Sequence, residues 1–187
     1  MNYYNDRGLY SLRGNKKTGA AFYSEFVLPL YERIYSFKPV LREWRDVIGF
    51  QVCSSKLVEF KQTLGFPLGP KNNVRMPAAV TDAGFGSDFL RGFLETDGCV
   101  YPENKYGKKY PRIELSTISE PLSSELSSVI RKQGISCSVW RQTYDNGWKP
   151  IYRVSARGKA NAKRWLEKIG TNHPRQREKL DSCVKWV

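Results

Sequence analysis

Two acidic residues, Glu95 and Asp97, stand close together at the end of an apparent amphipathic helix. The helix is indicated by apolar residues at helical spacing, namely Phe89, Leu90, Phe93 and Leu94. Gly98 follows and ends it. Carboxylates at this end of a helix face the negative pole of its dipole, which is unfavourable for folding. Because Mg²⁺ prefers oxygen ligands such as carboxylates, the placement indicates a metal-binding site more than a device that stabilises the fold.

The helix that carries these acids has two further features. Ser87 can cap its start, and Asp88 suits the positive pole in its first turn. Gly92 lies in its middle, where glycine costs about 1 kcal/mol relative to alanine. A packing partner that requires close approach of the backbone would offset that cost, so we expect an interface on the Gly92 face.

The nine residues Leu90–Gly98 resemble the signature of the LAGLIDADG homing endonucleases, of the archaeal intron and intein type. The first, third, eighth and ninth positions match outright, and Phe93, Leu94 and Glu95 are similar in type. Arg91 and Thr96 replace small apolar residues. The resemblance implies an α+β fold, a duplicated αββαββα unit with two antiparallel, saddle-shaped sheets. It also implies that Asp97, the acid before the final glycine, binds Mg²⁺ or Mn²⁺.

Charge and composition limit the class of protein. The 187 residues include 31 Lys and Arg against 18 Asp and Glu, an excess that indicates a nucleic-acid partner. No apolar stretch approaches the ~20 residues of a membrane span, so we expect no membrane partner. The four cysteines are widely spaced and argue against a zinc site or a disulfide framework. We expect a cytoplasmic protein of a prokaryotic or archaeal cell, associated with the nucleoid when bound.

Periodicity and turn signals predict a mixed order of strands and helices. The first half is expected to contain a strand at 9–13, a polar loop at 14–19, a helix at 24–35, a hairpin at 40–53 and a helix at 56–64. An irregular link at 65–86 precedes the signature helix, 88–98. The second half is then expected to contain a strand at 99–101, a charged turn at 103–109, a strand at 111–117, a helix at 119–132, a hairpin at 136–155, and helices at 159–169 and 174–183.

The order strand, helix, hairpin, helix therefore occurs twice, which indicates an internal duplication. Corresponding pairs include Trp44 with Trp140, Gln51 with Arg153, and Cys53 with Ser155. We expect a first, incomplete repeat at 1–78 and a second repeat at 79–187.

The first repeat has no visible signature helix, and two alignments of its start are open. In the one we favour, Leu9–Arg13 matches Ile113–Thr117, and the first helix and first strand would lie before Met1. In the other, residues 5–8 match the end of the signature, Asp6 is the first-half metal ligand, and a hairpin occupies 8–22. In both, the interface face formed by Leu90, Gly92 and Phe93 needs a partner from elsewhere: a second copy, an upstream segment or a reorganised N-terminus.

Strand residues that alternate toward one face of a sheet are candidates for contact with a DNA major groove. They are Arg42, Trp44, Gln51, Arg112, Glu114, Ser138, Trp140 and Arg153, with Gln142 added if its strand continues past Arg141. Gln51 and Arg153 occupy equivalent positions, and the resemblance implies that such residues assist hydrolysis beside Asp97. Lysines expected in hairpin loops would bind phosphates; they are Lys16, Lys17, Lys105, Lys108 and Lys109.

These features predict an intron-encoded homing endonuclease, a nuclease and hydrolase that cleaves double-stranded DNA at a long pseudo-palindromic site with magnesium. The alternative is an intron RNA maturase or a catalytically degenerate DNA-binding relative. The missing first-half acid favours that alternative. His173 is the one histidine in the sequence, which excludes a zinc site with several histidines.

Overall fold

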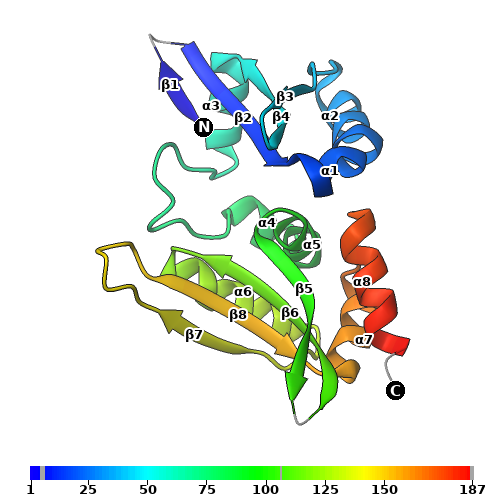
Figure 1. Ribbon diagram of the computed structural model, residues 1–187. Coiled ribbons are helices and arrows are strands. Elements are labelled where there is room, and N and C mark those ends of the chain that lie inside the picture. Colours follow the sequence, from blue (N-terminus) through cyan, green and yellow to red (C-terminus); the bar gives the residue numbers. More distant parts are fainter. Residues whose placement is uncertain (5–6, 106, 186–187) are drawn as a thin grey trace. The chain divides into compact units, whose positions relative to one another are not determined.

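The computed structural model describes residues 1–4, 7–105 and 107–185, and the chain divides into two compact units, Met1–Gly69 and Pro70–Val187. The division lies earlier than residue 78, the boundary expected from the sequence. The reason is that Val74 and Met76 pack against the core of the second unit. Arg75 also bonds to Glu125 there, with Nη1 and Oε1 2.8 Å apart. Each unit is described separately below (Figure 1).

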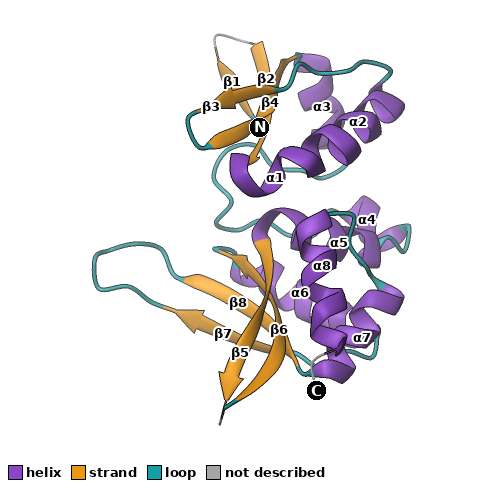
Figure 2. Cartoon of the chain, turned by 45° about the vertical axis from the view of Figure 1, so that its right-hand side comes forward, coloured by secondary structure: helices purple, strands orange, loops and turns teal. Residues whose placement is uncertain are grey.

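The first unit is one four-stranded antiparallel sheet with helices on one face (Figure 2). The sheet order is β1-β2-β4-β3. Its elements, in chain order, are β1 (Asn2–Tyr4), β2 (Arg7–Asn15), α1 (Lys16–Phe22), the π-helical turn η1 (Tyr23–Val27), α2 (Leu28–Tyr35), β3 (Arg42–Trp44), β4 (Val47–Cys53) and α3 (Ser55–Thr63).

The helical segment of this unit begins earlier than expected. The predicted polar loop at 14–19 is wrong, because Asn15 caps a helix there, its side chain accepting from the Thr18 amide at 3.2 Å. The segment runs through η1 into α2, where Pro29 lies in the first turn. The Leu28 amide donates to the Tyr23 carbonyl, five residues earlier, and closes the π turn. Pro29, which has no amide, therefore follows at the start of α2, where proline is tolerated.

The core of the first unit is aromatic. Tyr31 contacts Phe50 edge-on with ring centroids 4.9 Å apart, and Phe22 and Tyr23 are also buried. Tyr10 packs against this core from β2, as does Leu12. Since side chains alternate along a strand, the odd-numbered residues of β2 lie on the opposite face, which we call the open face.

The second unit repeats this architecture with more helices. Its sheet order is β5-β6-β8-β7, again antiparallel, and its helices gather on one face (Figure 2). Its elements are α4 (Ala78–Asp82), α5 (Gly86–Asp97), β5 (Gly98–Lys105), β6 (Lys108–Thr117), α6 (Glu120–Lys132), β7 (Ser138–Gln142), β8 (Ile151–Arg157), α7 (Lys159–Lys168) and α8 (Pro174–Lys185).

Most elements of this unit match the prediction. Ser119 caps α6 as expected, accepting from the Leu122 amide at 3.4 Å, and β7 reaches Gln142. Two expectations are wrong. Ser87 does not cap α5, since the helix already starts at Gly86. The turn expected at 103–109 is shorter, because pairing between β5 and β6 continues out to Lys105 and Lys108.

Strand register relates the two units residue by residue. Leu9 pairs with Asn2 and Cys53, whereas Glu114 pairs with Cys99 and Ser155. Leu9 and Glu114 therefore occupy equivalent positions, and the same register makes Gln51 equivalent to Arg153. The chain has the duplicated αββαββα fold of an α+β protein, as predicted.

The register also corrects both alignments of the first repeat. Leu9 corresponds to Glu114 rather than Ile113, a slip of one residue, and β1 is the first strand that was expected before Met1. The alternative hairpin at 8–22 is wrong because Arg7–Asn15 is one strand that runs directly into α1. Asp6 lies outside the described residues, and the position equivalent to Asp97 would precede Met1.

Trp44 and Trp140 are not equivalent, contrary to expectation. Trp44 pairs with Val47 across a two-residue turn, whereas Trp140 pairs with Arg153. If Gln51 is aligned with Arg153, the two tryptophans stand four residues apart in the ladder. The difference arises because the β7–β8 connection is longer than the β3–β4 turn.

Candidate nucleic-acid interface and metal site

The open face of the second sheet carries a buried polar network centred on Glu114. Its carboxylate accepts from Arg112 Nη2 and Arg153 Nη1, each at 2.5 Å. Ser155 Oγ and Tyr101 Oη also donate to it, at 3.1 and 3.3 Å. Glu114 is only 2% exposed although the described helices of its unit gather on the other face of the sheet (Figure 2). Charge-assisted bonds of this kind are roughly twice as strong as neutral ones, so the network is rigid.

Two aromatic residues account for the burial of this network. Tyr101 reaches it from β5, with its ring centroid 5.5 Å from the guanidinium carbon of Arg112. Trp140 reaches it from β7 and lies 5.4 Å from Arg153 and 6.0 Å from Arg112 by the same measure. Cation–π contacts hold Trp140 across the sheet, and its indole stays 39% exposed.

The electrostatics of the network favour ionised Glu114. Burial alone raises the pKa of this carboxyl, but the hydrogen bond from Arg153 and the charge of Arg112 outweigh it, and the pKa is lowered. The network extends outward through Glu103, which bonds Arg112 at 3.2 Å and Arg157 at 3.3 Å. Arg112 and Glu114 are thus bonded to each other, an arrangement that the prediction of separate base contacts did not include.

Asp97 ends α5 next to this face. It is exposed, and its Oδ2 accepts from the Thr96 hydroxyl at 3.2 Å. The next residue but one, Cys99, lies close enough to Glu114 that burial, and then that carboxylate, raise the pKa of its thiol. The chain therefore passes from the exposed acid directly into the polar network.

Asp97 fits the requirements of a divalent cation as a single ligand. Mg²⁺ usually binds through one or two carboxylates together with waters and substrate phosphates. Across residues 1–4, 7–105 and 107–185 there is no group of three His, Cys, Asp or Glu that could hold a metal ion. A cation at Asp97 would therefore need further oxygen ligands from DNA or from another acid.

Glu95, the other acid of the signature, has a structural role. Its Oε1 accepts from the Asn172 amide and from Thr171 Oγ1, the latter at 3.1 Å. Burial raises its pKa, while these bonds and Arg91 act to lower it. These contacts join α5 to the segment before α8, so Glu95 is not available as a metal ligand.

The predicted helix interface is only partly available. Leu90 is fully buried in the core of its own unit, so its assignment to an interface with another helix is wrong. Phe93 is partly buried against the same core. Gly92 is exposed, and a Cβ added there would meet nothing within 4 Å. The exposed stripe on α5 is instead formed by Asp88, Gly92 and Thr96, and exposed Phe85 precedes it as the N-cap.

The open face of the first sheet has a different character. Arg42 and Gln51 are exposed there, and Trp44 is half-buried. Arg13 stacks on Trp44 with its guanidinium carbon 4.6 Å from the ring centroid. Leu9 stands where Glu114 stands in the second sheet, so this face lacks the central carboxylate and its arginines are not neutralised in the same way.

The structure brings together one group of the predicted residues. Arg112, Glu114, Trp140 and Arg153 share one network, and Ser138 pairs with Ser155 at its edge. Gln51 belongs to the other unit. Gln142, expected if its strand continued past Arg141, accepts from Arg153 Nε at 2.9 Å. The sequence analysis missed three members of the network, although alternation along the strands could have identified them as neighbours; they are Tyr101, Glu103 and Ser155.

The predicted phosphate-binding lysines fall into two groups. Lys108 and Lys109 are exposed at the start of β6, beside the hairpin tip where β5 ends at Lys105. Lys16 and Lys17 lie at the start of α1 rather than in a hairpin loop. Lys16 also pairs with Glu43, with Nζ and Oε2 2.5 Å apart. The β5–β6 tip therefore remains the better candidate for phosphate contact.

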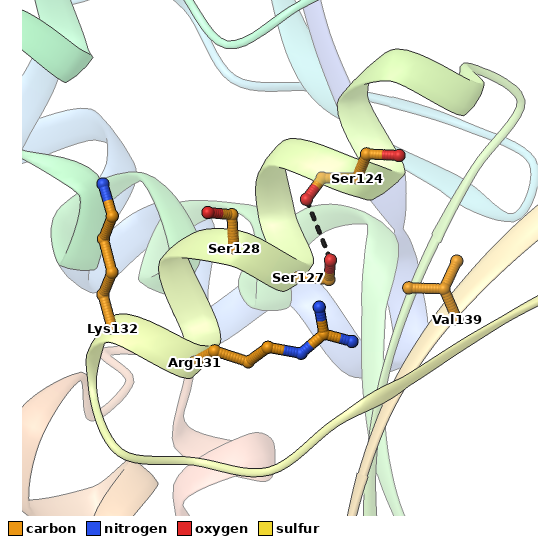
Figure 3. A pocket seen from close by; sticks show the side chains of 6 residues that line it. All are labelled: Ser124, Ser127, Ser128, Arg131, Lys132 and Val139. Carbon is orange, nitrogen blue, oxygen red and sulfur yellow. Dashed lines mark hydrogen bonds between the residues drawn. The ribbon is translucent and has the colours of Figure 1, made fainter.

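A shallow hollow between α6 and β7 lies on the helix side of the second sheet (Figure 3). It is lined by Ser124, Ser127, Ser128, Arg131, Lys132 and Val139. Ser127 donates to the Ser124 carbonyl at 2.8 Å, and Arg131 to the Cys137 carbonyl at 3.3 Å. Because α6 packs on the face opposite Glu114, this hollow is separate from the candidate interface. Among the described residues no helix is long and apolar enough to cross a membrane.

Sequence comparison finds a family match within the second unit. Residues 85–170 match a family described as a LAGLIDADG-like domain. The chain is 33% identical over 100 residues to the replicative DNA helicase DnaB of Rhodothermus marinus, covering 53% of this chain and 10% of the relative. It is 26% identical over 134 residues to the replication factor C small subunit of Methanocaldococcus jannaschii, covering 72% and 7%. The match thus spans a tenth or less of those relatives.

Solved structures extend the likeness to nearly the whole chain. The homing endonuclease I-DmoI in complex with DNA and Ca has a TM-score of 0.63 at 12% identity, covering 97% of this chain and 88% of that one. I-DmoI with DNA and Mn has a TM-score of 0.59 at 14% identity, covering 92% and 88%. Meganuclease I-SmaMI bound to uncleaveable DNA has a TM-score of 0.55 at 11% identity, covering 95% and 78%.

The family match and the fold point the same way: residues 85–170 are similar to LAGLIDADG-like domains, and the chain folds like solved homing endonucleases. The resemblance of Leu90–Gly98 predicted both, and the structural neighbours are the homing endonucleases I-DmoI and I-SmaMI.

Proposed function

We propose that this protein is a site-specific endonuclease for double-stranded DNA that hydrolyses phosphodiester bonds with Mg²⁺ or Mn²⁺. The single observation that carries the proposal is the position of Asp97. Its exposed carboxylate ends α5 and adjoins the open face of a sheet that carries Arg112, Arg153 and Trp140. The neighbouring fold of DNA-bound I-DmoI supports a duplex as the partner.

The roles of the residues follow from their chemistry. Asp97 would hold the divalent cation, which neutralises phosphate charge and lowers the pKa of a water molecule that attacks phosphorus. Attack by water forms one P–O bond and breaks the bond to the leaving sugar oxygen. Arg153 would steady the phosphate near the centre, and Gln51 would take the equivalent place in the first unit. Lys105, Lys108 and Lys109 would contact the phosphates of the DNA and would not contribute to sequence specificity.

Asp97 alone provides one carboxylate, and a second cation ligand would come from another acid. Asp6 lies outside the described residues, and the register excludes the alignment that suggested it. The proposed source is a helix that packs on the Gly92 face of α5, from a second copy or from an upstream segment. Sedimentation mass measurement with and without DNA separates these sources.

The test is cleavage of a duplex library with randomised inserts in the presence of Mg²⁺. We expect specific cleavage by the wild type, loss of cleavage by at least about a hundredfold in Asp97→Asn, and duplex binding in Ca²⁺ by both. Asp82→Asn is the matched control, because Asp82 is an exposed acid that ends α4 and accepts from the preceding threonine hydroxyl at 3.3 Å, as Asp97 does at the end of α5. Equal cleavage by Asp97→Asn and Asp82→Asn would contradict the role of Asp97.

A second candidate function is binding without cleavage, either of intron RNA or of DNA. It is favoured by the lack, among the described residues, of any group of three His, Cys, Asp or Glu that could hold a metal ion. Binding of the library without cleavage by the wild type, in Mg²⁺ and in Mn²⁺, would support this candidate. Stimulation of intron RNA splicing would then distinguish a maturase from a DNA-binding relative.

A further inference from the structure

The side chains of Arg91, Glu95 and Gln176 attach the end of α5 and the start of β5 to residues 169–176, which run from the end of α7 into the first turn of α8. Arg91 Nε donates to the Ile169 carbonyl at 2.7 Å, and Glu95 accepts from Asn172 and Thr171 as described above. Both anchors lie on the helix before Asp97, within two turns of it. They restrain the axis of the helix but do not by themselves determine where the chain goes after it.

Gln176 provides the third anchor, on the other side of Asp97. Its Oε1 accepts from the Val100 amide at 3.1 Å, and its Nε2 donates to the Gly98 carbonyl at 3.2 Å. β5 is the edge strand of its sheet, so these backbone groups have no strand to pair with on that side. The side-chain amide of Gln176 takes the place of a neighbouring strand by offering one donor and one acceptor.

In the first unit, the carbonyl at the start of the edge strand has a different hydrogen-bond partner. Met1 is equivalent to Gly98 in the register, and its carbonyl accepts from the Gly69 amide at 3.2 Å. Both units therefore bond the carbonyl at the start of the edge strand. In the second unit the partner is a side chain that also accepts from the amide two residues later, and Asp97 directly precedes the anchored carbonyl.

We propose that Gln176 is a positioning residue for a divalent cation at Asp97, a role that rests on the proposed function. The Asp97 carboxylate is exposed and bonded to its neighbour Thr96, so the packing of a core does not hold it. Its position depends on the backbone before and after it. Glu95 attaches the preceding helix to residues 171–172, and Gln176 attaches the following strand at Gly98 and Val100. Loss of supporting contacts around a metal ligand typically costs 10- to 100-fold in affinity or activity.

The test compares Gln176→Met, which keeps the size of the side chain and removes both bonds, with Gln62→Met. Gln62 is exposed on α3, so it provides the same chemical change without the anchor. Gln176→Glu is a second variant, which keeps the acceptor for Val100 and loses the donor to Gly98. It remains informative if Gln176→Met does not fold.

Four measurements decide the proposal. In Gln176→Met we expect hydrogen exchange of the Val100 amide to accelerate about tenfold, while duplex binding in Ca²⁺ stays within about twofold. In the DNA complex of Gln176→Met, the Mn²⁺ concentration that broadens the backbone NMR signals of residues 96–99 should be about tenfold higher than for the wild type. The concentration required for Gln176→Glu should lie between these two values. The Mg²⁺ concentration for half-maximal cleavage should rise in parallel.

The outcomes separate this proposal from the proposed function. If the Mn²⁺ requirement is the same in Gln176→Met and Gln62→Met, or if Mn²⁺ does not broaden these signals in the wild type, the positioning role is overturned. If the wild type binds Mn²⁺ at residues 96–99 with the expected dependence on Gln176 but cleaves no duplex, the positioning role stands and the endonuclease proposal fails.

Discussion

Leu9 and Glu114 occupy the same place in the two sheets, yet one is apolar and the other is the acceptor that Arg112 and Arg153 share. The two open faces therefore differ in charge. The second face has a neutralised, rigid centre beneath Trp140. The first keeps exposed Arg42 and Gln51 around Trp44. If both faces contact DNA, they would read their half-sites by different chemistry, which fits a pseudo-palindromic target better than a symmetric one.

Replacement of Glu114 by glutamine should destabilise the protein strongly. Glu114→Gln leaves two arginines without their shared charge in a buried network, and breaking a buried pair costs about 3–5 kcal/mol. Urea denaturation measures the free energy of unfolding. The control is Glu43→Gln, which breaks the exposed pair with Lys16 and should change stability by about 1 kcal/mol or less. Equal effects of the two variants would mean that the Glu114 network contributes no more than a surface pair.

His173 should make the protein less stable in mild acid. Burial lowers the pKa of its imidazole, so the folded state holds the proton more weakly than the unfolded state, whose pKa is about 6.5. This contribution to stability is present above about pH 6.5 and is lost as the pH falls through the lower folded pKa. NMR titration of His173, the one histidine in the sequence, measures that pKa directly.

The unfolding free energy provides the second readout for His173. It should decrease between pH 7 and pH 5, and His173→Gln should flatten that decrease. Glu95 acts with the opposite sign, because its raised pKa gives a contribution that is lost as the pH rises. An imidazole pKa at or above 6.5 would refute the prediction.

Removal of one lysine at the hairpin tip should change the salt dependence of DNA binding rather than its sequence preference. Lys108→Ala or Lys109→Ala should lower the slope of log K against log salt by about one. Binding titrations at several salt concentrations, on cognate and random duplexes, test this. Lys163→Ala on α7 removes the same charge from the helix side of the unit and should leave the slope unchanged. A loss confined to the cognate duplex would instead indicate base reading.

The two glycines of the signature should respond oppositely to alanine. At Gly98 a Cβ would meet Leu94 Cα at 2.7 Å and Leu115 Cδ2 at 2.9 Å, so Gly98→Ala should cost about 1–3 kcal/mol. At Gly92 it would meet open space, and Gly92→Ala should stabilise the helix by up to about 1 kcal/mol.

Thermal denaturation compares the two glycine variants, and sedimentation of Gly92→Ala tests the proposed helix contact. If another helix packs closely on Gly92, the added methyl group should weaken that association although the unit itself is more stable. Unchanged association would indicate that Gly92 does not face a close partner.

Local pattern in the sequence determined much of this protein. The spacing of Phe89, Leu90, Phe93 and Leu94 predicted α5, and the Asn146-Gly147 dipeptide predicted the β7–β8 hairpin, because both signals act between residues a few positions apart. The resemblance of Leu90–Gly98 predicted the LAGLIDADG-like domain and the duplicated fold. It also made Asp97 the candidate ligand, which stays a prediction.

Only the tertiary structure decided how distant segments meet. It showed that Leu9 occupies in the first sheet the position that Glu114 occupies in the second. Pairing between strands far apart in the chain sets this register, and a slip of one residue would move every side chain of a strand to the other face. The tertiary structure buried Leu90, which the sequence analysis had assigned to an outer interface. It also joined Gln176 to Gly98 and Val100, because a side chain on α8 reaches the edge of β5 only once the sheet and the helices have packed together.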